Sequence, residues 1–198
     1  ADPIEVRDRW ASIADGLGVT EPPMMYRRMT GPLTAQIESV RKTVLKNEIS
    51  LVIIDSALPA AGGQAENAEA TENFFAALRS LEISSMIIAH QSKPQLGFVS
   101  NSPFGSVFWL NEGRSIWQIA SEGEPGINTL QVGLFHRKVN QGGLQKDLGF
   151  SIEFVSREDI QSEFGQIIIK KLEISKSDLR KELKLPGLLE AILRDPDD

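Results

Sequence analysis

Two apolar runs that each end in polar residues constrain the fold of this chain more than any other feature. Residues 51–54 (Leu-Val-Ile-Ile) run without interruption into Asp55, and residues 85–90 form a second run that ends at His90. An apolar run without alternation is typical of a parallel strand that is covered on both faces. A helical pattern over residues 66–81 separates the two runs. We therefore expect adjacent parallel strands, with Asp55 and His90 at the same edge of the sheet.

The rest of the chain extends this pattern into an α/β fold. Helical spacing over residues 5–17 and 33–47 precedes the first strand, and residues 24–29 are a short strand candidate. After a long loop and a short helix at 107–113, we expect strands at 114–120, 129–136 and 149–155, which suit an antiparallel extension of the sheet. From residue 156 the pattern is helical, at 157–172, 175–184 and 187–194. The prediction is a mostly parallel sheet flanked by helices in residues 1–155, with an antiparallel extension, and a small helical tail in residues 156–198.

Composition excludes several classes of protein. The chain has 198 residues, of which 41% are hydrophobic and 24% charged, as in ordinary globular proteins. It contains no cysteine, so disulfide frameworks and thiolate metal sites are excluded. No apolar run is long enough to span a membrane, and no signal-peptide pattern is present, so we expect a cytoplasmic protein. The net charge of −6 argues against a globally basic nucleic-acid coat, although it leaves room for a local basic groove.

Polar residues at the ends of the two predicted strands are the first candidates for chemistry. A carboxylate such as Asp55 at the carboxyl end of a parallel strand lies where α/β sheets bind ligands, and it could hold Mg²⁺. Ser56 could share that coordination shell. His90 and Gln91 would face the same rim. The simpler alternatives are that Asp55 caps the next turn and that His90 is a hydrogen-bonded core histidine.

Cations further along the chain form a second group of candidates. Arg137 and Lys138 precede the glycine-rich turn at residues 141–143. In an extended strand they point to opposite faces, so we expect one of them to be buried at an interface or a site. They could reach the phosphates of a neighbouring subunit, or they could belong to a solvated hairpin tip. Arg114 opens an apolar strand, for which a structural ion pair is the simpler explanation.

The order of these segments resembles that of RecA-like P-loop ATPases of the hexameric replicative helicase kind, in particular the RepA-type proteins of phages, plasmids and prophages. The segment LVIIDS resembles their Walker B strand, and IIAHQSK resembles their sensor strand. PFGSVFWLNEGRSIW resembles the loop that follows, and FHRKVNQGGLQKDLGFSIEF resembles the hairpin that carries a cation to the neighbouring subunit. The resemblance covers about residues 1–155.

The resemblance implies roles for the candidate residues. Asp55 and Ser56 would bind ATP with Mg²⁺, and His90 and Gln91 would sense the γ-phosphate. Lys138 would extend across the subunit interface of a ring, with Arg137 as a second candidate. Asn140 stands where a second arginine is common in the family. The contact across the subunit interface is therefore left to Lys138 and Arg137.

A loop at residues 92–106 would occupy the place of a central-channel loop in such a ring. Lys93, Phe98 and Phe104 could then bind single-stranded DNA by stacking and by one phosphate contact. A surface loop without this role is the alternative. The tail from residue 156 could be a DNA-binding helix-turn-helix, or a subdomain for packing or oligomerisation.

One half of the nucleotide site is missing from the sequence. The phosphate-binding pattern G-x-x-x-x-G-K-[ST] does not occur in the 198 residues, and the resemblance places it, with a catalytic glutamate, ahead of Ala1. We therefore expect the C-terminal part of an ATP-dependent DNA helicase or related ring-forming motor, inactive in ATP hydrolysis as an isolated chain. The alternative is a non-hydrolysing DNA-binding or regulatory protein on the same scaffold. A fragment, a split gene product and a decayed paralogue all remain open.

Overall fold

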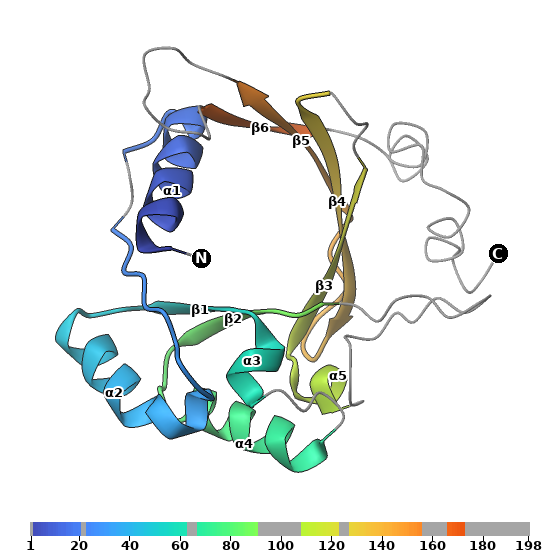
Figure 1. Ribbon diagram of the computed structural model, residues 1–198. Helices are drawn as coiled ribbons and strands as arrows, with labels where there is room; N and C mark the ends of the chain where they lie inside the picture. Colours follow the sequence, from blue (N-terminus) through green and yellow to red (C-terminus); the bar gives the residue numbers. More distant parts are fainter. Residues whose placement is uncertain are drawn as a thin grey trace. The chain divides into compact units, whose positions relative to one another are not determined.

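The computed structural model describes residues 2–20, 23–62, 67–90, 108–122, 127–155 and 166–172 (Figure 1). The chain divides into two compact units, one formed by residues 29–114 and the other by residues 1–28 together with 115–198. Each unit is described by itself. Among the described residues, no helix combines the length and the apolar character needed to cross a membrane.

The 29–114 unit is built around two parallel strands. Its elements in chain order are α2 (Leu33–Lys46), β1 (Leu51–Asp55), α3 (Ala57–Ala61), α4 (Ala68–Arg79), β2 (Ser84–Ile88) and α5 (Phe108–Glu112). Strands β1 and β2 pair in parallel, from Leu51 opposite Ser84 to Asp55 opposite Ile88. The expectation of adjacent parallel strands is therefore confirmed. Helix α3 is a single short turn of five residues that follows β1 directly and ends at Gly62 in the left-handed conformation.

An aromatic cluster forms the core of the 29–114 unit. Phe74, Phe75 and Trp109 are all buried, with 5.4 Å between the ring centroids of each pair. Such edge-on and tilted pairs are favourable beyond the apolar area that they bury. Val52, Ile54 and Ile87 pack against this core from the strands. Helices α2, α3 and α4 accordingly lie on one side of β1 and β2 (Figure 1).

The other face of this small sheet is exposed. Leu51 and Ile53 of β1 are 45% and 54% exposed, and Met86 and Ile88 of β2 are 54% and 43% exposed. The expectation that these strands are covered on both faces is therefore wrong for β1 and β2 as the structure has them. The physical reason is that the core of the unit packs against one face of the sheet, so burial alternates along β1.

The second unit contains a four-stranded antiparallel sheet. Its elements are α1 (Pro3–Leu17), β3 (Ser115–Glu122), β4 (Thr129–Val139), β5 (Leu148–Val155) and β6 (Gln166–Leu172), and the strand order is β3-β4-β5-β6. The expected antiparallel strands are confirmed, although β4 extends three residues past His136. In the part of the chain that the structure describes they form a sheet of their own, so the expectation that they extend the parallel sheet is wrong.

Two sequence expectations fail in this unit. The helix expected at 157–172 is wrong for residues 166–172, which form β6 and pair with β5. Ile167, Ile168 and Ile169 are β-branched and favour a strand. Residues 24–29 form no strand. The rest of the predicted helical tail, at residues 156–165 and 173–198, lies outside the described residues.

Helix α1 packs closely on β6, as Figure 1 shows. The side chain of Asp2 caps the helix by accepting a hydrogen bond from the Ile4 N–H, and Gly18 ends it in the left-handed conformation. Near its end, Gly16 approaches the backbone of β6 so closely that an added Cβ would lie 1.7 Å from the carbonyl oxygen of Ile167. Glycine is therefore required at this contact.

Candidate functional site

The carboxyl ends of β1 and β2 form the first candidate site. Asp55 is the last residue of β1, and His90 lies two residues past the end of β2. Because Asp55 pairs with Ile88 in a parallel register, both candidates lie at the same edge of the sheet, as expected. Both residues are exposed. This is the edge at which open α/β sheets bind ligands.

The alternative explanations for these two residues do not fit the structure. The N-cap residue of α3 is Ser56 rather than Asp55, and the Ser56 side chain makes no capping hydrogen bond. Asp55 therefore does not cap this helix. His90 is exposed, so it is not a buried core histidine. Among the described residues no group of three or more His, Cys, Asp or Glu side chains could hold a metal ion, so Asp55 would bind Mg²⁺ only together with other ligands such as phosphates and water.

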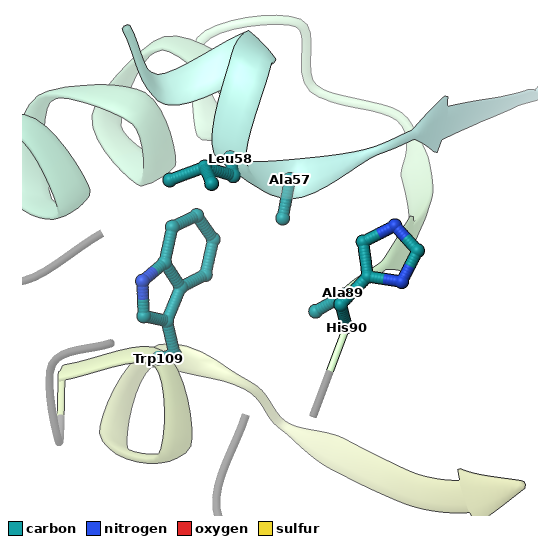
Figure 2. Close-up of a pocket in the computed structure, with 5 residues that line it drawn as sticks. All are labelled: Ala57, Leu58, Ala89, His90 and Trp109. Atoms are coloured by element: carbon teal, nitrogen blue, oxygen red, sulfur yellow. The ribbon is translucent and has the colours of Figure 1, made fainter. Parts of the chain in front are cut away.

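A small pocket opens beside His90. Figure 2 shows its five lining residues, with the Trp109 ring and the His90 ring on either side of Ala57. The cavity volume is about 30 Å³, which holds about two water molecules. Its walls are mostly apolar, and the buried indole Nε1 of Trp109 has no hydrogen-bond partner among the described residues. The pocket is too small for a nucleotide base.

The structure gives no support for a role of the other residues that were predicted in this region. Arg114 is exposed and forms no ion pair with any residue that the structure describes, so the structural ion pair suggested for it is not found. Gln91 and the three residues expected to bind DNA, Lys93, Phe98 and Phe104, lie outside the described residues.

Arg137 is the centre of the second candidate site, in the β-sheet unit. Ile116 pairs with Lys138 and Trp117 pairs with His136, so Arg137 is the extra residue of a β-bulge. Its guanidinium lies 5.1 Å from the centroid of the Phe135 ring. Its Nε donates a 2.7 Å hydrogen bond to Oε1 of the buried Gln118. Arg137 therefore folds back onto the sheet rather than extending from a solvated hairpin tip.

The electrostatics of Arg137 are unusual for a surface arginine. Burial lowers the pKa of its guanidinium from the ordinary value, and attraction to Asp147 partly opposes this shift. The Nη2 atom is buried and has no hydrogen-bond partner in the described part of the chain. An unpartnered buried donor is costly, so this guanidinium retains the capacity for one further acceptor. Lys138 lies next to it and is half-buried.

Sequence reasoning missed the partners of these cations. Gln118 and Phe135 are opposite each other in the β3–β4 register, and both contact Arg137. His136 was not among the candidate residues, yet it is buried and makes polar contacts with Ser115 and Gln145. The partners of His136 and Arg137 depend on the β3–β4 register and on the bulge at Arg137, neither of which the sequence specifies.

Comparison with known families gives a match over slightly less than half of the chain. Residues 5–95 match the family model of an AAA domain. No curated protein matches the chain. The matched segment includes β1, β2, Asp55 and His90, and it supports an AAA-type, P-loop ATPase-like family. It does not extend to β3–β6.

Proposed function

We propose that this chain supplies the Mg²⁺-binding part of a cytoplasmic, RecA-like P-loop ATPase that drives a ring-forming DNA helicase or a related DNA motor. The observation that carries the proposal is the position of Asp55 and His90 at one edge of paired parallel strands, within the segment that matches an AAA domain. The α/β architecture of the 29–114 unit supports it.

Asp55 has the properties that a Walker B carboxylate needs. It is exposed at the end of β1 and is not used to cap α3. Oxygen ligands suit Mg²⁺, which is commonly held by one or two carboxylates together with phosphate oxygens and water. When bound with ATP, Mg²⁺ neutralises charge on the β- and γ-phosphates. We assign Asp55 to this ion and Ser56 to its hydrated shell, and we assign His90 and Gln91 to sensing the γ-phosphate.

The phosphate-binding loop must come from elsewhere. Residues 1–198 contain no G-x-x-x-x-G-K-[ST] pattern, and the backbone N–H groups of such a loop are the main cradle for phosphates. We therefore expect the purified chain to release phosphate from ATP no faster than background. Steady phosphate release that is abolished by Asp55→Ala would contradict this expectation.

Binding of Mn²⁺·ATP gives a test that does not depend on hydrolysis. Paramagnetic Mn²⁺ should broaden the backbone amide signals of Ser56 and His90, and Asp55→Asn should remove this broadening. Glu82→Gln is the matched control, because Glu82 is an exposed carboxylate that precedes β2 at the opposite edge of the sheet. The proposed site is wrong if broadening at the rim is absent, or if it survives Asp55→Asn.

The two cations of β4 are proposed to act between subunits of a ring. Lys138 would reach a nucleotide of the neighbouring subunit. For Arg137, the unpartnered Nη2 supports a further contact with an anion, although the side chain would have to leave Phe135 and Gln118 to extend far. Sedimentation of the chain with and without Mg²⁺·ATP tests ring formation, and a chain that stays monomeric under both conditions would speak against it.

Single-stranded DNA is the proposed polymer substrate. Lys93, Phe98 and Phe104 would contact it by one phosphate interaction and by stacking. We expect weak binding, measured by fluorescence anisotropy of a labelled oligonucleotide at two salt concentrations, with the shallow salt dependence of one phosphate contact. If Lys93→Ala with Phe98→Ala leaves binding unchanged, these residues are not the DNA site. DNA binding without any Mn²⁺·ATP signal would favour the alternative, a non-hydrolysing DNA-binding or regulatory protein.

A further inference from the structure

His136 is a buried histidine whose ring is held on three sides. It is 6% exposed, and its imidazole stacks on Trp117 with 4.4 Å between ring centroids and an interplanar angle of 7°. The Nδ1 atom lies 2.8 Å from the backbone nitrogen of Gln145, and Nε2 lies 3.0 Å from the hydroxyl of Ser115. No step of the proposed ATPase function uses this ring.

The hydrogen bonds define which form of the ring fits. A backbone N–H is always a donor, so Nδ1 must accept from Gln145 and cannot carry a proton. In a neutral imidazole the proton is then on Nε2, which donates to the hydroxyl of Ser115. The neutral ring with its proton on Nε2 therefore satisfies both contacts at once.

These contacts join three parts of the sheet unit. Ser115 is the first residue of β3, and His136 lies near the end of β4. Gln145 belongs to the connection between β4 and β5, residues 140–147, which has no strand pairing and is exposed from 140 to 146. His136 thereby fixes the connection to the start of β3. Asp147, which attracts Arg137, lies in the same connection.

We propose that His136 is a proton-operated clamp: its neutral ring holds the β4–β5 connection against β3 and β4, and protonation releases that connection. A protonated imidazole has an N–H group at both nitrogens. The new Nδ1–H would face the N–H of Gln145, so that hydrogen bond is lost and two donors point at each other. Ser115 can still accept a hydrogen bond from Nε2. Protonation therefore frees the connection between β4 and β5 but leaves the contact with β3 in place.

The charged residues around the ring are few, and their kinds allow a pH response of the connection to be assigned to His136. The charged residues on the surrounding elements are Arg114 ahead of β3, Arg137 and Lys138 on β4, and Lys146 and Asp147 in the connection. Arg, Lys and Asp side chains ordinarily keep one charge state between about pH 5 and 8, whereas imidazole gains a proton in that range.

Amide hydrogen exchange in the intact chain tests the clamp. The exchange rate of the Gln145 amide is measured by NMR between pH 8 and pH 5, relative to the rate of an unstructured peptide at each pH. We expect protection at pH 8 and a roughly tenfold loss of protection at pH 5, the size expected for one hydrogen bond. The ¹⁵N chemical shifts of His136 should show the proton on Nε2 at pH 8.

Two variants at position 136 separate the hydrogen bond from the ring stack. The amide oxygen of His136→Asn can take the place of Nδ1 but cannot titrate, so Gln145 should remain protected at both pH values. His136→Phe keeps the stack on Trp117 without any acceptor, so protection should be absent at both. The clamp is refuted if wild-type Gln145 is equally protected at pH 5 and pH 8, or if the two variants behave alike. If a variant fails to fold, the pH dependence of Gln145 protection in the wild type decides whether the clamp exists.

Discussion

Replacing Gly16 with alanine tests the packing of α1 against β6. A Cβ at this position would lie 1.7 Å from the carbonyl oxygen and 2.4 Å from the carbonyl carbon of Ile167. Both are backbone atoms, so no side-chain rotation can relieve the clash. Ordinary contact begins near 3.4 Å, so the end of α1 would have to retreat from the strand by about 1.7 Å.

Two opposing terms set the size of the effect. Alanine is favoured over glycine inside a helix by about 1 kcal/mol. Overpacking that forces backbone shifts typically costs about 1–3 kcal/mol, and a clash with backbone belongs at the upper end of that range or beyond. We expect the free energy of unfolding of this unit to fall by about 2 kcal/mol, which corresponds to a drop of roughly 10 °C in Tm.

Urea unfolding followed by circular dichroism measures this change. Gly143→Ala is the matched control, because Gly143 lies in the same unit and an added Cβ there meets nothing within 4 Å. It should change stability by less than about 0.5 kcal/mol. If Gly16→Ala is as stable as the wild type, or more stable, α1 does not pack on β6 as described.

Three further changes probe other contacts by the same unfolding measurement. Arg137→Met should lower the free energy of unfolding by about 1–3 kcal/mol, because it leaves Oε1 of Gln118 buried without a donor. Adding Gln118→Leu should restore most of that stability. If the double variant is no more stable than Arg137→Met, the contact does not exist as described. Phe74→Ala should lower the free energy of unfolding by about 3–5 kcal/mol, because Phe74 is fully buried. Leu45→Ala, at a position that is 71% exposed, should change it little. Similar losses for the two variants would place the core elsewhere. Asn67→Ala should cost about 1 kcal/mol by removing the N-cap of α4, and an unchanged stability would exclude that cap.

The strands that carry the first site could be predicted from sequence because their signal is local. An apolar run of four residues that ends in a carboxylate specifies a strand and its end, and a helix between two such runs implies parallel pairing. The position of Asp55 and His90 at one edge follows from these two facts. β6 was missed because a short apolar run such as Ile167–Ile169 fits a buried helix as well as a strand, and periodicity alone cannot separate them.

The surroundings of Arg137 could not be predicted in the same way. The rule that neighbouring residues point to opposite faces requires a regular strand, and the bulge at Arg137 interrupts that regularity. The partners Gln118 and Phe135 follow from the β3–β4 register, which depends on how two distant segments align. One of the two cations was expected to be buried, whereas both are half-buried. The stacking of Arg137 on Phe135 and its unpartnered Nη2 required the structure.

The two faces of β1 connect the fold to the proposed function. Leu51 and Ile53 are as apolar as Val52 and Ile54, yet only the second pair packs on the core. A strand exposed on one face ordinarily alternates with polar residues, so the sequence of β1 suits cover on both faces. Burial alternates along β1, and Asp55 is exposed together with Leu51 and Ile53. Asp55 therefore lies on the same face of β1 as the exposed apolar residues, so the candidate ligand faces away from the core of this unit.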